Sequence, residues 1–307
     1  MRFAASARAH ALRWLLAILT VAIGAPAFSQ ESLTLRKIRE TGLITLGYRD
    51  GSIPFSYLDD RQRPIGYSMD ICRLIVDEVR RRLRIVDLQI KLTPVNSATR
   101  IPMVANSSVD LECGTTTNTL ERQKHVAFTL TTFVAVSRLA SKQASDIRGL
   151  DSLRGKTVVS TAGTTSVARL VELNGLRDLQ MNILAGKDHS QSFRMVETDR
   201  AVAFAMDDVL LYGMIAMAKD PSAFVVTGEA LSVEPYGIAL RKGDPEFKKL
   251  ADDTIVKLFK SGEIFALYKK WFESPIAPRP INLHLPMSAA LKKLIAQPTD
   301  SGDPADY

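Results

Sequence analysis

Residues 43–47 read Leu43-Ile44-Thr45-Leu46-Gly47, a short apolar run that begins directly after Gly42. A run of this length that is bounded by glycine predicts a buried β-strand. Farther along, Ser68 is expected to cap a helix whose apolar residues recur at helical spacing, namely Ile71, Leu74, Ile75, Val79 and Leu83. A strand followed by an amphipathic helix is the unit from which α/β folds are built.

The same unit recurs through the first part of the chain. A short helix is expected over 33–40, before the first strand, and further strands are expected over 88–92 and 109–112. Helices are expected to begin near Arg100 and to cover 119–124. This alternation predicts a mostly parallel sheet with helices on its faces.

A second series of the same kind follows an extended segment at 131–139. Its expected elements are, in chain order, strand 156–160, a turn and helix within 163–174, strand 179–184, helix 190–197 and strand 201–206. A chain that repeats one α/β plan, and that is too long for a single ordinary core, is expected to form two lobes.

The last section is expected to return to the first lobe. A strand at 236–240 precedes two helices whose apolar and aromatic residues have helical spacing, which we interpret as core: Phe247, Leu250, Ile255, Leu258, Ile264, Leu267, Tyr268, Trp271 and Phe272. The extended stretches 131–139 and 225–240 would then form a two-strand hinge. A hinge between two α/β lobes places a cleft at the sheet edges, where such sheets bind ligands.

We therefore predict an α/β fold of two lobes. Residues 30–134 and 236–285 would form the first, discontinuous lobe, and 135–235 the second. Residues 286–307 would be a C-terminal extension, and its polar tail, 298–307, is expected to be disordered.

The first 29 residues have the features of a secretory signal peptide. The basic beginning contains Arg2, Arg8 and Arg13. An apolar centre follows at 14–19, and small residues suited to cleavage follow at 25–29. A transmembrane anchor is disfavoured because Gly24 and Pro26 interrupt a run that is short for a span of roughly 20 residues. No cysteine lies nearby to carry a lipid, so we expect a soluble protein in a bacterial periplasm.

Charge and histidine usage exclude several classes of function. The net charge of +7 includes the three arginines of the signal peptide, so the mature chain carries +4. This mild excess suits an anionic small ligand but does not predict nucleic-acid binding, which needs clustered Lys and Arg on one face. The four histidines lack metal-ligand spacing, so we expect no metal and no cofactor.

The two cysteines, Cys72 and Cys113, leave two alternatives open. In an oxidising compartment they would form a disulfide, which by the loop-entropy model contributes about 4 kcal/mol. Alternatively, they are two buried free thiols. The residues alone do not decide between these alternatives.

Polar side chains gather where strands end and helices begin. In the first lobe these are Arg49, Ser97, Arg100, Thr115, Thr116, Thr117 and Arg122. In the second they are Thr164, Thr165, Ser166, Lys187, Asp188, His189, Asp207 and Asp208. A helix N-terminus suits a carboxylate, and an acidic side chain suits an ammonium. Together with the arginines, this chemistry points to an acidic amino acid.

Each of these residues also has an ordinary structural interpretation. Arg122 could be a helix-surface residue, Arg100 a salt-bridge partner, and Asp207 a helix cap. Ser97 and Thr165 could also act as caps, although capping does not exclude ligand binding. The functional interpretation rests on the whole set.

Nine short motifs extend this pattern in order along the chain. They are GYR (47–49), PFSY (54–57), GYSMD (66–70), NSATRIP (96–102), ECGTTTN (112–118), ERQK (121–124), GTTS (163–166), KDH (187–189) and VAFAMDD (202–208). Together, from about residue 33 to 280, they resemble the glutamate/aspartate-binding proteins of polar amino-acid ABC transporters, within solute-binding protein family 3. The resemblance implies a periplasmic binding fold of type II that closes on its ligand.

The resemblance also implies a role for each site residue. Arg122 would grip the α-carboxylate with help from Thr117 and Thr165. Asp207 would take the ammonium with help from Thr115. The side-chain carboxylate would be surrounded by Arg49, Ser97, Arg100 and His189. Tyr48 stands where the family has histidine, and Thr115 where it has serine, so the preference between glutamate and aspartate stays open.

The predicted function is therefore capture of glutamate or aspartate and delivery to the membrane permease of an ABC transporter, by a protein expected to be monomeric and not an enzyme. Two alternatives stay open. One is a periplasmic enzyme on the same fold, similar to cyclohexadienyl or arogenate dehydratases, although no Cys-His or Ser-His pair is seen at motif level. The other is a sensor that presents its ligand to a receptor.

Overall fold

The computed structural model describes residues 31–307. The predicted signal peptide, residues 1–29, lies outside the described residues. Within 31–307, every helix is too short or too polar to cross a membrane.

A five-stranded sheet forms the centre of the first lobe, with strand order β5-β1-β6-β14-β7. Its strands are β1 (Leu43–Tyr48), β5 (Gln89–Pro94), β6 (Leu111–Glu112), β7 (Val126–Phe128) and β14 (Ala239–Arg241). The first strand pairs in parallel with β5 and β6, as the strand-helix alternation predicts. The late strand β14 pairs antiparallel with β6 and β7, so the end of the chain returns to this lobe.

A six-stranded sheet forms the centre of the second lobe, with order β10-β9-β11-β8-β12 and β13 paired to β8. Its strands are β8 (Phe133–Lys142), β9 (Thr157–Thr161), β10 (Asn182–Gly186), β11 (Ala203–Asp207), β12 (Phe224–Val226) and β13 (Ser232–Tyr236). A small third sheet consists of β2 (Gly51–Ser52), β3 (Ser56–Leu58) and β4 (Pro64–Ile65).

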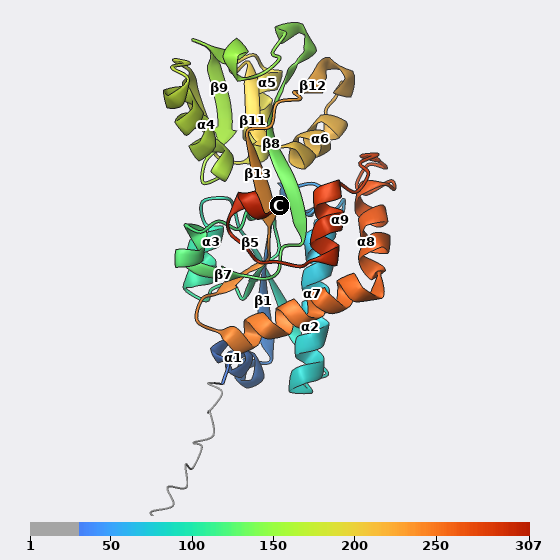
Figure 1. Cartoon of the computed structure of the whole chain (residues 1–307). Helices are drawn as coiled ribbons and strands as arrows, with labels where there is room; N and C mark the ends of the chain where they lie inside the picture. The colour runs from blue at the N-terminus through green and yellow to red at the C-terminus, as the bar shows by residue number, and fades with distance from the viewer. Residues whose placement is uncertain (1–30) are drawn as a thin grey trace, which may run out of the picture. The chain divides into compact units, whose positions relative to one another are not determined.

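Two paired strands connect the lobes (Figure 1). β8 and β13 run antiparallel, from the pair Phe133–Tyr236 to the pair Ser137–Ser232. We propose the lobe boundaries at 134/135 and 235/236, inside these two strands, so that β8 and β13 form the hinge. The division into 30–134 with 236–285, 135–235 and 286–307 remains our proposal.

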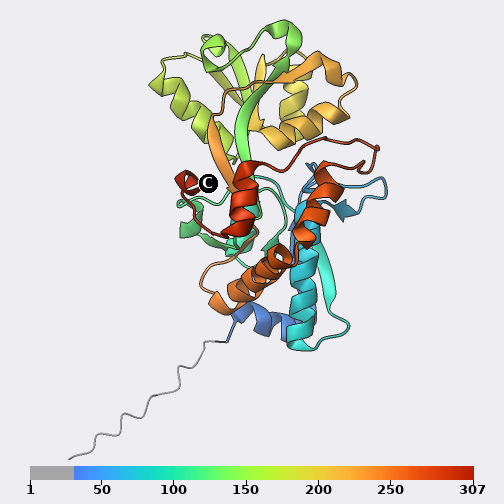
Figure 2. The ribbon, with the colours of Figure 1, turned by 45° about the vertical axis from the view of Figure 1, so that its right-hand side comes forward.

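Helices cover both sheets (Figures 1 and 2). The α-helices are α1 (Leu33–Thr41), α2 (Tyr67–Leu83), α3 (Arg100–Ala105), α4 (Thr165–Leu176), α5 (His189–Glu197), α6 (Asp208–Met217), α7 (Pro245–Ser261), α8 (Glu263–Phe272) and α9 (Ala289–Ala296). The 3₁₀ helices are η1 (Arg122–Lys124), η2 (Gln143–Ser145), η3 (Leu150–Leu153), η4 (Pro221–Ala223) and η5 (Pro304–Asp306).

The late aromatic stripe lies in the core, as its spacing predicts. Tyr268, Trp271 and Phe272 of α8 are buried, and Phe272 stacks on Phe133 at the start of β8 with ring centroids 5.1 Å apart. Phe55 meets the same ring edge to face. These contacts bind the hinge strand to the first lobe, since burial of each ring contributes roughly 1.5–3 kcal/mol.

Two local predictions are wrong. Ser68 does not cap α2, because Gly66, with φ 137°, occupies the N-cap and the helix begins one residue later. Ser68 lies in the first turn and donates its hydroxyl to the carbonyl of Gly114, 2.7 Å away. The helix expected over 119–124 is only the 3₁₀ turn η1, because β7 begins at Val126 and ends it.

Cys72 and Cys113 form a disulfide in the structure, with their Cα atoms 6.1 Å apart. The bond joins the buried face of α2 to the residue that follows β6. It therefore anchors the loop that carries Thr115 and Thr117 to the main helix of the first lobe.

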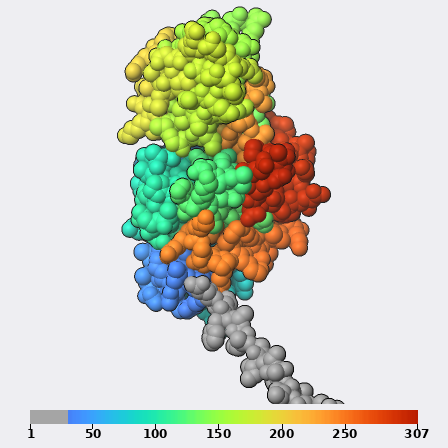
Figure 3. Space-filling view, turned by 60° about the vertical axis from the view of Figure 1, so that its left-hand side comes forward, coloured from blue at the N-terminus to red at the C-terminus, as the bar shows by residue number. Residues whose placement is uncertain are grey.

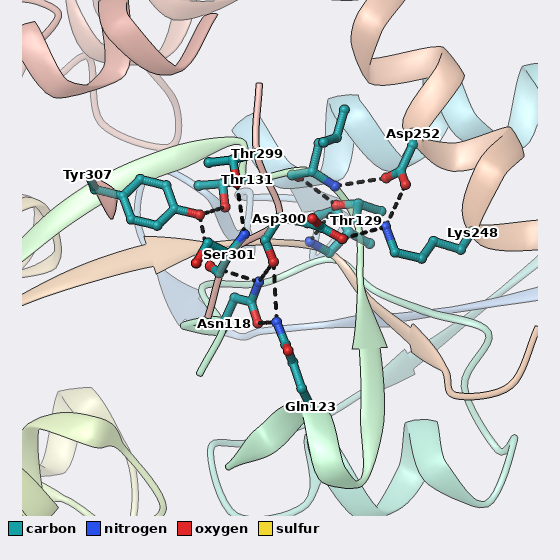
Figure 4. Close-up of polar contacts among 12 residues, drawn as sticks. Asn118, Gln123, Thr129, Thr131, Lys248, Asp252, Thr299, Asp300, Ser301 and Tyr307 are labelled. Carbon is teal, nitrogen blue, oxygen red and sulfur yellow. Dashed lines mark hydrogen bonds and ion pairs between the residues drawn. The ribbon is translucent and has the colours of Figure 1, made fainter. Parts of the chain in front are cut away.

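The prediction that 298–307 is disordered is also wrong. The segment lies along the first lobe, where Asn118 and Gln123 donate to the carbonyl of Asp300 (Figure 4). Its sequence is polar, but its backbone finds partners on residues far away in the chain. Composition alone therefore predicts solvent exposure for a segment whose backbone carbonyls accept hydrogen bonds from the first lobe.

Candidate functional site

The strands of both sheets bring the predicted site residues to the space between the lobes. Each residue lies near the end of a strand or the beginning of a helix, which is where open α/β sheets bind ligands. From the first lobe come Arg49 after β1, Ser97 and Arg100 at α3, Thr115 and Thr117 after β6, and Arg122 at η1. From the second come Thr165 at α4, His189 at α5 and Asp207 at the end of β11.

Several contacts join the lobes at this site, among them three that involve predicted site residues of the clustered loops. Nη2 of Arg49 lies 3.4 Å from Nε2 of His189. The hydroxyls of Thr117 and Thr165 lie 3.4 Å apart. Arg122 donates from Nη2 to the carbonyl of Gly163 over 3.2 Å. The structure thus brings residues from both lobes into one cluster.

Arg49 is almost fully buried, with 4% of its surface exposed. Its Nη2 donates to the hydroxyl of Ser97 over 3.0 Å. Its Nη1 is buried without a hydrogen-bond partner among residues 31–307. Burial, together with the nearby charge of Arg100, lowers the pKa of Arg49 to about 10.

Arg100 and Arg122 complete a cluster of three guanidinium groups. Arg100 is buried and donates from Nη1 to the carbonyl of Thr115 over 3.0 Å, while its Nε has no partner within the described chain. Arg122 donates from Nη1 to the carbonyl of Thr117 over 2.8 Å. Burial, followed by repulsion from Arg100, lowers the pKa of Arg122 to about 9. An anion between these groups would relieve that repulsion.

His189 is held as a neutral imidazole. Its Nδ1 lies 3.0 Å from the hydroxyl of Thr161. Burial, with the charges of Arg49 and Arg100, holds its pKa well below the ordinary value of 6.5. One ring nitrogen is therefore an acceptor and the other a donor.

Asp207 is the acidic residue at the end of β11. It accepts hydrogen bonds from the hydroxyl of Tyr236 and, over 3.3 Å, from that of Ser166. Burial, followed by repulsion from Glu234, raises its pKa from 3.8 to about 8. A cation placed beside this carboxyl would therefore favour its ionised form.

Glu234 and Glu112 are two further buried carboxylates of the site. Glu234, on β13, accepts from Thr117 over 2.7 Å, from Thr165 over 2.6 Å, and from Ser232. Glu112, at the end of β6, accepts from Thr116 over 2.6 Å. Its other oxygen has no partner among residues 31–307.

Open space flanks the cluster on two sides. A cavity of about 190 Å³ is lined by Arg49, Ser52, Asn96, His189 and Ser190 among others. A groove of about 470 Å³ is lined by Thr117, Arg122, Thr165, Glu234 and Gly302 among others. Groups of His, Cys, Asp and Glu that could hold a metal ion are absent from residues 31–307.

Comparison with known proteins agrees with this architecture. The family model of the bacterial extracellular solute-binding proteins, family 3, matches residues 44–274. The chain belongs to this family. The expected fold class, an α/β fold of two lobes of the periplasmic binding type, is confirmed.

Individual members of the family match over most of the chain. An "L-glutamate/L-aspartate-binding protein" of Pseudomonas aeruginosa is 50% identical, covering 92% of this chain and 95% of the relative. A "Glutamate/aspartate import solute-binding protein" of Salmonella typhimurium is 47% identical, covering 90% and 91%. Among solved structures, a mutant of ArgBP from T. maritima has a TM-score of 0.70 at 26% identity, covering 78% of this chain and all of the other.

In this family 3 solute-binding protein, the structure brings together all nine residues that the sequence singled out. Sequence reasoning missed the roles of Glu234, Glu112 and Tyr236. Glu112 is part of a motif that the sequence highlights, but Glu234 and Tyr236 lie in a stretch interpreted only as a hinge. The predicted charge balance, three arginines against one acid, is therefore incomplete.

Proposed function

We propose that this solute-binding protein captures glutamate or aspartate between its lobes and delivers it to the permease of an ABC transporter. The observation that carries the proposal is the pair of buried donor nitrogens, Nη1 of Arg49 and Nε of Arg100, that lack partners among residues 31–307. Buried donors cost free energy until an acceptor meets them. A ligand carboxylate supplies such acceptors and the matching charge.

The proposed ligand contacts follow the chemistry of each group. Arg122 binds the α-carboxylate. Asp207 binds the ammonium with Thr115. Arg49, Ser97, Arg100 and His189 surround the side-chain carboxylate. The approach of the ammonium would return Asp207 to its ionised form, because an opposite charge favours ionisation.

Thr117 and Thr165 assist Arg122 in this proposal. Each hydroxyl has one proton and donates it to Glu234. The backbone N–H of Thr165, the first residue of α4, has no intrahelical acceptor and is suited to the ligand carboxylate. Glu234 would then hold the two side chains in place instead of contacting the carboxylate.

An acidic ligand suits the site better than the corresponding amide. A carboxylate presents only acceptors, whereas an amide turns an NH₂ group toward one of the guanidinium donors. Leaving a buried charge without its partner costs roughly 3–5 kcal/mol. The names of the two relatives that are 50% and 47% identical point to the same pair of ligands.

Binding and delivery, and not catalysis, is the function that these relatives support, since both are named as binding proteins. We further propose that the chain acts in the periplasm as a monomer and that the permease recognises the closed arrangement of its lobes. The dehydratase alternative predicts turnover of prephenate or arogenate by the purified protein.

Calorimetry with glutamate, aspartate, glutamine and asparagine tests the proposal. We expect both acids to bind and each amide to bind at least tenfold more weakly. Because a ligand stabilises the state that it binds, the same acids should raise the melting temperature. Absence of binding by both acids would overturn the proposal.

A further inference from the structure

The C-terminal residues 298–307 form a segment that we call the strap. It follows α9, whose Leu291 and Leu294 are buried. Figure 2 shows α9 beside the hinge, and Figure 3 shows the C-terminal residues, in red, on the surface of the first lobe. The strap therefore reaches the region between the sheets from the far end of the chain.

The strap is hydrogen-bonded to the loop that carries two proposed ligand-binding residues. Asn118 donates from Nδ2 to the carbonyl of Asp300 over 2.8 Å, and Gln123 donates to the same carbonyl over 3.2 Å (Figure 4). Asn118 directly follows Thr117, and Gln123 directly follows Arg122. Each residue held by the strap is thus the neighbour of a site residue.

Gly302 packs directly on this loop. A Cβ atom at Gly302 would lie 2.7 Å from the backbone nitrogen of Leu120 and 2.9 Å from the carbonyl carbon of Thr119. Both neighbours are backbone atoms, which cannot move aside as a flexible side chain can. The close approach therefore requires glycine at this position.

The strap is anchored at its other contacts to separate parts of the first lobe. Lys248 of α7 forms an ion pair with Asp300 at 2.9 Å. The backbone of Thr131 donates to the carbonyl of Thr299 over 2.8 Å, and its hydroxyl lies 2.6 Å from that of Tyr307. Figure 4 shows these contacts converging from both sides of the strap. The strap thus joins the site loop to α7 and to the base of the hinge strand β8.

Asn118 connects the same loop to the second hinge strand. Its backbone N–H donates to the carbonyl of Pro235 in β13 over 2.7 Å, and its side chain is almost fully buried. The strap therefore holds the side chain of the same residue, Asn118, whose backbone fixes this short loop to the hinge. Loss of the strap would free the Asn118 side chain while leaving this backbone bond.

We propose that the strap is a positioning element that holds Thr117 and Arg122 in their ligand-binding geometry before the ligand arrives. The proposal rests on the proposed role of Arg122 at the α-carboxylate. A preformed site binds more tightly because the ordering cost is met during folding and not during binding. The strap does not touch the ligand; it acts through the loop.

Two variants test the strap, with one matched control. The first ends the chain at Gln297, and the second is Gly302→Ala, which keeps every strap hydrogen-bonding group. The control is Lys292→Ala, an exposed residue of α9. Calorimetry should show glutamate affinity reduced about tenfold by either strap variant and unchanged by the control, where a tenfold change corresponds to about 1.4 kcal/mol.

A double-mutant cycle separates positioning from general stability. In an Arg122→Ala background, removal of the strap should lower affinity by less than about threefold, because the group that it positions is gone. An equal loss in both backgrounds would overturn the proposal. A lower melting temperature with unchanged affinity would also overturn it.

Hydrogen exchange tests the strap without any ligand. In either variant, the amides of residues 117–124 should exchange at least about tenfold faster than in the parent protein, while those of α5 stay unchanged. Unchanged exchange at 117–124 in a folded variant would overturn the proposed positioning role of the strap. If the parent protein binds neither acid, the proposed function fails. Hydrogen exchange would still test whether the strap orders residues 117–124.

Discussion

Nε2 of His189 lies 3.4 Å from Nη2 of Arg49, and the two side chains come from different lobes. The arrangement requires the imidazole to be neutral, because an imidazolium would face a guanidinium without an intervening anion. Its Nδ1 faces the hydroxyl of Thr161 at 3.0 Å. The contact therefore contributes to lobe closure only while the ring stays unprotonated.

The lowered pKa of His189 predicts how stability depends on pH. Below pH 6.5, the ordinary value, the unfolded chain binds a proton that the folded protein does not bind. The contribution of His189 to stability should therefore fall as the pH drops from 6.5 toward 5, with a slope of up to about 1.4 kcal/mol per pH unit.

Urea denaturation between pH 5 and pH 8 measures the net slope, to which Asp207 contributes with the opposite sign, so the slope of His189 is the difference between the parent protein and His189→Gln. His189→Gln should remove it, whereas replacement of the exposed His125 by Gln should leave it in place. A slope that is the same in His189→Gln as in the parent protein would show that His189 does not contribute.

The raised pKa of Asp207 predicts proton release on ligand binding. With a pKa of about 8, Asp207 is mostly protonated at pH 7 in the ligand-free protein. Tyr236, Glu234, Asp208 and Arg100 are the charged and titratable groups that act on it. Glutamate brings an ammonium to this carboxyl and should expel the proton.

Calorimetry in two buffers detects this proton. At pH 7 the binding enthalpy should differ between phosphate and Tris. The difference should equal the number of protons released multiplied by the difference between the ionisation enthalpies of the two buffers. Asp207→Asn should weaken binding and abolish the difference. Identical enthalpies for the parent protein in both buffers would contradict the prediction.

The sign of the same shift predicts a second effect. Because the folded protein keeps the proton of Asp207 to a higher pH than the unfolded chain, its contribution to stability is complete below pH 3.8. That contribution is lost as the pH rises toward 8. Asp207→Asn should therefore be more stable than the parent protein near pH 8, as measured by the urea midpoint.

Much of the site could be predicted from the sequence, because parallel strands fix where their carboxyl ends meet. Arg49, Thr115 and His189 each follow or open an element that the apolar pattern identifies, so their convergence follows from topology. Ser68 shows the limit of local reasoning. Gly66, two residues earlier and with a positive φ, is the N-cap of the helix. The hydroxyl of Ser68 instead donates a hydrogen bond to the carbonyl of Gly114.

Glu234 could not be identified from its own surroundings in the sequence. Its two threonine partners lie 117 and 69 residues away in the chain and belong to different lobes. The strap has the same property, since its polar composition suits solvent equally well. Only the packing of distant segments distinguishes these residues from ordinary surface ones.

Arg100 should distinguish acidic from neutral ligands. Arg100→Ala removes a buried guanidinium and should lower glutamate affinity on the order of 100-fold, since a charged hydrogen bond contributes about 1.5–3 kcal/mol. Glutamine should lose less than about tenfold, because its side chain carries no charge. Arg73→Ala, a half-exposed arginine paired with Asp70, serves as the control. Equal losses for the two ligands would refute a side-chain role for Arg100.

Glu234 should act together with its threonine partners in ligand binding. Glu234→Gln keeps the shape but removes the charge and one acceptor, so we expect affinity to fall about tenfold. Thr165→Val should cost a similar amount, and the double variant should be less weak than the product of the two, with a coupling of about 0.5–3 kcal/mol. Glu273→Gln, on the surface, should have no effect. Strictly additive losses would show that Glu234 and Thr165 act independently.

The disulfide should stabilise the fold more than it affects binding. It closes a segment with a sequence separation of 41, for which the loop-entropy model gives about 4 kcal/mol. A double variant, Cys72→Ala with Cys113→Ala, should therefore have a much lower urea midpoint. Its glutamate affinity should change less than about threefold, because Thr117 and Arg122 keep their contacts with Glu234 and Gly163. The strap also still holds their neighbours Asn118 and Gln123. A loss of affinity as large as that of Arg122→Ala, in a variant that still folds, would mean that the bond and not the strap positions the site loop.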